Sequence, residues 1–158
     1  MIKIDVKNFG SIKIELDPTA APKTCENFEK LVSEGFYDGL TFHRIIKGFM
    51  IQGGDPKGNG TGDSKQKIVG EFKSNGFENP ISHKRGVISM ARTSDPNSAS
   101  CQFFIVHEDS EFLDGDYAAF GHVVEGIEVV DAIATVSTNP DDSPCKKVVI
   151  KKIAIVNE

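Results

Sequence analysis

The chain has 158 residues, a formal net charge of −5 and 39% hydrophobic residues, which is enough for one domain with a sizeable buried core. We predict a single domain over residues 1–158, stable without disulfide or metal crosslinks. The acidic balance argues against nucleic acid as a partner, because nucleic-acid-binding surfaces need clustered lysine and arginine.

Apolar residues at every second position from 2 to 6 and from 12 to 16 flank Asn8-Phe9-Gly10, which predicts an antiparallel hairpin. From Pro22 the apolar spacing becomes helical, and Gly35 is a suitable place for this helix to end. Alternation and turn residues predict further strands at 41–46, 49–52, 86–91, 102–106 and 118–123, and a second helix from about 128 to 134.

In the last predicted strand the alternation of apolar residues shifts by one position. Val148 and Ile150 have one parity, while Ile153 and Ile155 have the other. A bulge near 151–152 would place both pairs in the core. Many short strands with two helices predict an all-β sandwich or barrel, and periodicity does not choose between the two.

The three cysteines, Cys25, Cys101 and Cys145, are odd in number and far apart, so neither a disulfide framework nor a zinc site is indicated. No stretch approaches about 18 consecutive apolar residues, and no signal-peptide pattern begins the chain. We therefore expect a cytoplasmic protein with no membrane partner. We also expect no metal and no cofactor.

The segment FHRIIKGFMIQGGD, which begins at Phe42, is the most informative part of the chain. At period two, Arg44, Met50 and Gln52 share one face, and a bend would bring Phe49 onto it. A fixed positive charge, an amide and an apolar hollow would suit proline in a peptide. On composition alone, however, ordinary strand and core material is the better interpretation.

This segment closely resembles the signature of the cyclophilins, the peptidyl-prolyl cis/trans isomerases. The resemblance continues through SMARTSDPNSASCQFFI (Ser89 to Ile105) and EFLDGDYAAFGHVVEG (Glu111 to Gly126), in the family's order and spacing. It implies a closed eight-stranded antiparallel β-barrel capped by two α-helices. It also implies an enzyme that accelerates rotation about X-Pro peptide bonds and assists protein folding, with proline-containing peptides and unfolded or folding proteins as partners. We expect a monomer.

Rotation about an X-Pro bond needs no nucleophile, metal or proton donor, but the prolyl nitrogen becomes a hydrogen-bond acceptor as the bond twists. Arg44 is the candidate catalytic donor, because a guanidinium stays charged and offers five N–H groups. The resemblance also assigns substrate-binding roles. The proline pocket is Phe49, Met50, Phe104 and Leu113, Gln52 binds the substrate backbone, and Ala91, Arg92 and Gln102 line the peptide groove.

Three positions depart from the family's usual residues. Phe112 replaces a frequent Trp, Tyr117 a frequent His, and Arg92 an Asn whose contact is made by the main chain. Phe112 and Tyr117 are still expected in the groove. Because the Trp helps the inhibitor cyclosporin to bind in this family, we expect only weak cyclosporin binding. His43 is expected on the face opposite Arg44, with a structural role.

Two other functions could be expected from the same sequence. The glycine-rich stretch at 53–62 lacks the Gly-Lys-Ser/Thr ending of a phosphate loop and leads into no evident helix. A binding module that captures proline-containing segments in the manner of a chaperone or adaptor, with isomerisation incidental, would use the same groove. The two functions differ in their dependence on Arg44, which turnover requires more than binding does. No second specificity pocket is evident, so a broad choice of the residue before proline is expected.

Overall fold

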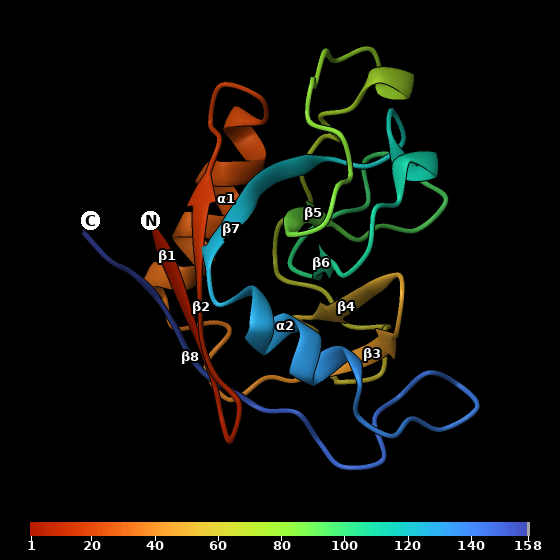
Figure 1. The fold of residues 1–158 in the computed structure, drawn as a ribbon. Coiled ribbons are helices and arrows are strands. Elements are labelled where there is room, and N and C mark those ends of the chain that lie inside the picture. The colour runs from red at the N-terminus through yellow and green to blue at the C-terminus, as the bar shows by residue number, and fades with distance from the viewer. Residues whose placement is uncertain (158) are drawn as a thin grey trace.

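The structure is a computed structural model, and it describes residues 1–157. Eight antiparallel strands form one curved sheet that is accompanied by two α-helices (Figure 1). The strands are β1 (Ile2–Val6), β2 (Gly10–Leu16), β3 (Phe42–Ile46), β4 (Met50–Gly53), β5 (Val87–Met90), β6 (Phe103–Val106), β7 (Ala119–Glu125) and β8 (Ile150–Ile155). The helices are α1 (Pro22–Ser33) and α2 (Ile127–Ala134), with short 3-10 turns η1 (Lys73–Asn75) and η2 (Glu111–Leu113).

The strand order is β3-β4-β6-β5-β7-β2-β1-β8, so β3 and β8 are the two edges of a half-barrel. The prediction of eight antiparallel strands with two helices is confirmed, but the closed ladder is not present in the described sheet. Residues 39–42 do approach the start of β8, where Phe42 N–H donates to Val148 O over 3.0 Å. Pairing then stops, because the next outward-facing amide of β3, that of Ile45, donates to Asp142 O of a loop instead.

The first helix begins at Pro22 as predicted, and a distant loop completes its N-terminus. Ala21 at the N-cap offers no side-chain hydrogen bond. The carboxylate of Glu71 accepts from the N–H and the hydroxyl of Thr24, both over 2.7 Å. Because the first amides of a helix have no partner within the helix, this contact both stabilises α1 and fixes the loop that carries Glu71.

The bulge predicted in the last strand is confirmed. Asp5 pairs with Lys152 and Val6 with Ile150, which leaves Lys151 unpaired. Ile150 and Ile153 are consequently both buried. The expectation that Ile155 also joins the core is wrong, because this residue ends an edge strand and is 45% exposed.

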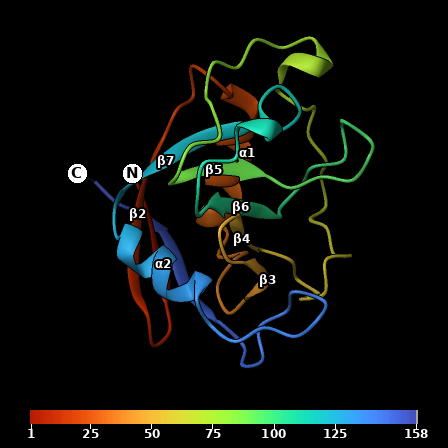
Figure 2. The same ribbon diagram turned by 45° about the vertical axis from the view of Figure 1, so that its right-hand side comes forward.

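Apolar side chains pack on both faces of the sheet and form two clusters. The main core lies between the sheet and the helices, where α1 contacts β8 and α2 contacts β2 and the β3–β4 hairpin (Figure 2). The smaller cluster lies on the other face and is composed of Met50, Val87, Phe104, Val106, Leu113 and Ala119. Since successive side chains of a strand point to opposite faces, β6 supplies Phe103 to the main core and Phe104 to the smaller cluster.

Candidate active site

The β3–β4 hairpin places the predicted catalytic and amide groups side by side. Arg44 is directly opposite Gln52 in the ladder, and Ile46 is opposite Met50. Gly48 allows the tight turn between them with a φ of +82°, a conformation that glycine adopts at little cost. The prediction that these side chains share one face is confirmed, and Arg44 Nη1 donates to Gln52 Oε1 over 3.3 Å.

Beside Arg44 lies a pocket of about 110 Å³ with an apolar floor. The floor residues Met50, Phe104 and Leu113 are buried. The lining comprises Arg44, Phe49, Met50, Gln52, Ala91, Arg92, Phe104, Leu113 and Tyr117. These are all the predicted site residues except Gln102 and Phe112, so the structure brings together positions up to 73 residues apart in the sequence.

Phe112 lies outside the lining of this pocket and contacts it through Phe49. Its side chain is 73% exposed, and its ring centroid lies 5.5 Å from that of Phe49. The exposed ring of Phe112 and the partly buried ring of Phe49 together extend the apolar surface beyond the pocket.

Gln102 lines a second pocket, of about 290 Å³, which the sequence did not predict. The two pockets share Gln52, Ala91 and Arg92, so they form one continuous groove. Gln52 Nε2 donates to Gln102 Oε1 over 3.0 Å, which continues the hydrogen-bond chain that begins at Arg44. Residues 60–63 line part of the second pocket. Their sequence has no periodicity, so it did not predict this pocket.

A buried histidine network supports the pocket floor from below. His83 stacks on Phe104 with a centroid separation of 6.0 Å and an interplanar angle of 18°. Its two ring nitrogens lie 2.9 Å from Asp114 Oδ1 and 2.9 Å from Ser89 Oγ. The His83 ring is therefore buried, whereas the next two residues, Lys84 and Arg85, are exposed.

Burial sets the charge state of the same network. It lowers the pKa of His83, although Asp114 opposes this effect. Burial by itself would raise the pKa of Asp114, but hydrogen bonds from Ser82 and His83 lower it overall. A neutral imidazole beside an ionised carboxylate is thus the form that holds Phe104 at neutral pH.

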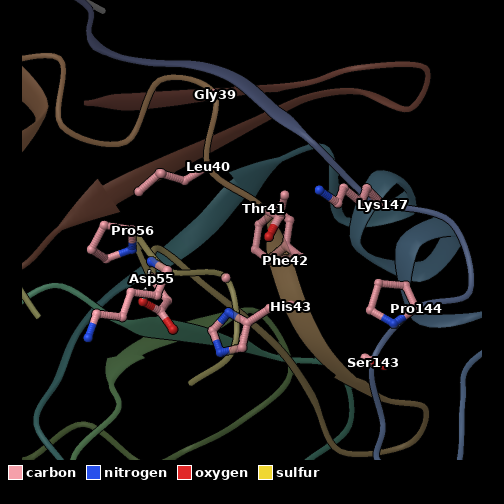
Figure 3. Close-up of a pocket in the computed structure, with 12 residues that line it drawn as sticks. Gly39, Leu40, Thr41, Phe42, His43, Asp55, Pro56, Ser143, Pro144 and Lys147 are labelled. Atoms are coloured by element: carbon pink, nitrogen blue, oxygen red, sulfur yellow. Dashed lines mark hydrogen bonds between the residues drawn. The ribbon is translucent and has the colours of Figure 1, made fainter. Parts of the chain in front are cut away.

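His43 lies on the face of β3 opposite Arg44, as expected. It lines a separate pocket of about 350 Å³ together with Asp55 and Lys147 (Figure 3). Within residues 1–157 neither ring nitrogen has a hydrogen-bond partner, and burial lowers the pKa of this histidine. Both observations favour a neutral ring that does not act on a substrate bound beside Arg44.

The glycine-rich stretch has no phosphate-binding geometry. The Asp55 carboxylate accepts the amides of Lys57, Asn59 and Gly60, which turn inward toward it. A phosphate loop needs such amides free to face an anion. Across the described residues no group of three histidine, cysteine or acidic side chains is placed to hold a metal ion.

Cys101 sits next to the groove residue Gln102 but is inaccessible. The residue is buried, and burial raises the pKa of its thiol to about 11. Because the thiolate is the reactive form, this cysteine behaves as a small apolar residue at neutral pH.

Comparison with known proteins identifies the family. The family described as "Cyclophilin type peptidyl-prolyl cis-trans isomerase/CLD" matches residues 1–155. The chain belongs to the cyclophilins. It is therefore a peptidyl-prolyl cis-trans isomerase, as its sequence motifs predict.

Relatives support this assignment over nearly the full length. This cyclophilin is 42% identical over 149 residues to peptidyl-prolyl cis-trans isomerase CYP18-1 of Arabidopsis thaliana, covering 94% of this chain and 91% of that one. It is 50% identical over 119 residues to peptidyl-prolyl cis-trans isomerase B of Bacillus subtilis, covering 75% of this chain and 80% of the relative.

A solved structure shares the whole fold. A cyclophilin type peptidyl-prolyl cis-trans isomerase of Cryptosporidium parvum, crystallised in the presence of the dipeptide Ala-Pro, superimposes with a TM-score of 0.91 at 33% identity. The similarity covers 99% of each chain. Within residues 1–157 of this cyclophilin, no helix has the length and apolar character needed to cross a membrane.

Proposed function

We propose that Arg44 is the catalytic residue of this isomerase and that the pocket beside it holds the substrate proline. The observation that carries the proposal is the placement of one guanidinium at the edge of a small pocket floored by Met50, Phe104 and Leu113. A volume of about 110 Å³ suits a pyrrolidine ring, and rings and a thioether suit its apolar surface.

The chemistry requires only rotation. The X-Pro bond resists twisting by about 18–20 kcal/mol, because the nitrogen lone pair is delocalised into the carbonyl. Twisting releases the lone pair, so a donor aimed at the prolyl nitrogen stabilises the transition state much more than the planar ground state. The Arg44 side chain is exposed, and its bond to Gln52 uses one of five N–H groups, which leaves donors for this nitrogen and for the substrate carbonyl.

One donor does not supply the whole acceleration. Reducing the exchange time from tens of seconds to milliseconds needs roughly 5–6 kcal/mol, of which a well-placed donor contributes about 3–4. The remainder comes from gripping the ring between Phe49 and Phe104 and from holding the flanking backbone. We assign the backbone contacts to Gln52, Ala91, Arg92 and Gln102, with Phe112 and Tyr117 as walls of the groove.

We further propose that the chain works as a single-domain monomer in the cytoplasm, where it isomerises proline-containing segments of unfolded or folding proteins. Two free cysteines that are buried and a third that is exposed support a reducing compartment. The net charge of −5 supports the expectation that neither nucleic acid nor an anionic membrane is a partner.

We also propose that the sheet closes into a barrel. Three backbone hydrogen bonds support a seam between residues 39–42 and 148–150, with donor–acceptor distances of 2.7, 2.8 and 3.0 Å. If the seam closes the barrel in solution, the amides of Gly39, Phe42 and Ile150 should exchange with deuterium as slowly as those of central strands. Rapid exchange at all three would contradict closure.

NMR exchange spectroscopy on a short X-Pro peptide tests the catalytic assignment. Arg44→Ala should slow cis/trans exchange by roughly 10²–10³ while the circular dichroism spectrum stays unchanged. Arg85→Ala is the matched control, since Arg85 forms an ion pair with Asp131 outside the groove; it should exchange the peptide at close to the unaltered rate. An Arg44→Ala variant with full activity would refute the assignment, and peptide binding retained by this variant would separate catalysis from simple capture.

A further inference from the structure

The guanidinium of Arg92 is held in a fixed position at the boundary between the two pockets of the groove. Its central carbon lies 4.9 Å from the ring centroid of Phe72 and 4.9 Å from that of Tyr117. Nε donates to Asp116 O over 2.8 Å, and Nη1 donates to Thr93 O over 2.9 Å. Two aromatic rings and two carbonyls therefore immobilise a side chain that is ordinarily flexible.

This clamp leaves part of the guanidinium available. Two of the five N–H groups are used in the contacts above, and the described residues supply no acceptor for the other three. Arg92 lines both the proline pocket and the second pocket, and it is only partly buried. Any peptide that fills the proline pocket and continues into the second pocket must pass these groups.

The surroundings of Arg92 favour an anion. The two pockets contain two cations, Arg44 and Arg92, and one carboxylate, Asp63, which accepts from Ser100 Oγ over 3.2 Å. The protein as a whole carries a net charge of −5, so this groove departs in sign from the molecule around it. A fixed, partly desolvated arginine pairs well with a carboxylate, because little side-chain freedom is lost when the pair forms.

We propose that Arg92 makes this isomerase prefer X-Pro segments in which an aspartate or glutamate lies within two residues of the proline, with the acidic side chain bound by Arg92. The inference rests on the proposed function, since it places the substrate in the groove beside Arg44. The sequence predicts a broad choice of the residue before proline. The present proposal instead predicts an order of preference within two residues of proline, with acidic residues favoured over neutral ones and neutral over basic ones.

A role for Arg92 confined to the fold is the competing explanation, because its hydrogen bond to Asp116 O also ties down the segment after η2. Such a role predicts that loss of Arg92 changes the rate on every peptide by the same factor. The electrostatic role predicts a change in the ratio between peptides of different charge, and this ratio is independent of any general loss of activity.

The test uses a set of peptides of equal length with one glutamate, glutamine or lysine at each of the two positions before and the two positions after a single proline. Exchange rates are measured by NMR at low salt. At one of the four positions at least, the glutamate peptide should be exchanged about 2- to 5-fold faster than the glutamine peptide, and the lysine peptide should be slowest. The preference should shrink in 0.5 M salt, where the Debye length is about 4–5 Å.

In Arg92→Met the glutamate-to-glutamine ratio should fall to about one, whereas Lys151→Met, which removes a charge from the exposed bulge of β8, should keep the ratio of the unaltered protein. Equal rates for glutamate and glutamine at all four positions, or a ratio that survives in Arg92→Met, would overturn the inference. If the glutamine peptides were not isomerised at all, or if Arg44→Ala isomerised them normally, the proposed function itself would fail.

Discussion

The two faces of the β4-β6-β5 region carry adjacent aromatic residues with different tasks. Phe103 is fully buried in the main core, with ring centroids 5.4–6.0 Å from those of Tyr37, Phe28 and Phe42 in edge-on geometry. Phe104, the next residue, faces a smaller cluster whose outer side is the pocket beside Arg44. The inner face is filled by aromatic packing, whereas the outer face is left incomplete. Under the proposed function, the substrate proline ring fills this space.

The largest expected effect is a loss of stability on removing the Phe103 side chain from the main core. Phe103→Ala should lower the free energy of unfolding by about 3–5 kcal/mol, because the cavity would be enclosed by rings that cannot collapse into it. Urea denaturation followed by circular dichroism measures the change. Activity per folded molecule should alter little, and a stability loss below about 1 kcal/mol would show that the inner face is not close-packed around this ring.

The matched variant at Phe104 should lose more activity and less stability than the variant at Phe103. Phe104→Ala should reduce kcat/KM by roughly 10²-fold, because it removes the floor against which the proline packs and the ring on which His83 stacks. Its cost in unfolding free energy should be smaller than that of Phe103→Ala. Equal stability losses in the two variants, with normal exchange of an X-Pro peptide by Phe104→Ala, would remove the distinction between the faces.

A larger side chain at Phe112 would extend the apolar surface next to the pocket. Since Phe112 is 73% exposed beside Phe49, Phe112→Trp has room for an indole, which adds contact area and an N–H donor. Cyclosporin should then inhibit roughly 5- to 150-fold more strongly than it inhibits the unaltered protein, equivalent to about 1–3 kcal/mol. Isomerase activity should change less. An inhibition titration in which the variant is no more sensitive would show that Phe112 does not border the inhibitor site.

The smallest effect concerns pH, and it separates activity from stability. The exchange rate should be nearly constant from about pH 6 to 8, because rotation about the X-Pro bond transfers no proton. A rate change with its midpoint near pH 6.5 that disappears in His43→Ala would contradict both this expectation and the structural role of His43.

Stability, unlike activity, should depend on pH, and it should fall below about pH 6.5. Burial lowers the folded-state pKa of His43 and His83 below the ordinary value of 6.5. The unfolded chain therefore binds more protons once the pH falls below about 6.5, so the free energy of unfolding should decrease by up to about 1.4 kcal/mol per pH unit for each histidine. Urea midpoints at pH 7 and pH 5 measure this loss, and His43→Leu should show a smaller one. An unchanged loss in that variant would show that His43 is not the source.

Sequence periodicity was sufficient wherever strands and side-chain alternation define the site. The face shared by Arg44 and Gln52 and the bulge at Lys151 follow from counting residues. The family motifs predicted the other residues that line the pocket beside Arg44. The second pocket and the clamp on Arg92 were missed. They depend on Phe72 and on residues 60–63, which lie in loops without periodicity, where hydrogen bonds to distant groups decide the conformation.

The unpaired residue Lys151 restricts insertions and deletions in β8. β8 pairs with β1 on one side, while the residues at its start form the seam with the segment before β3. The extra residue lets a single strand satisfy two neighbours whose side-chain alternation is out of phase. Deleting it would turn Val148 and Ile150 toward solvent or break the seam, whereas a substitution there would alter only an exposed side chain. At this position the number of residues is under tighter physical constraint than their identity.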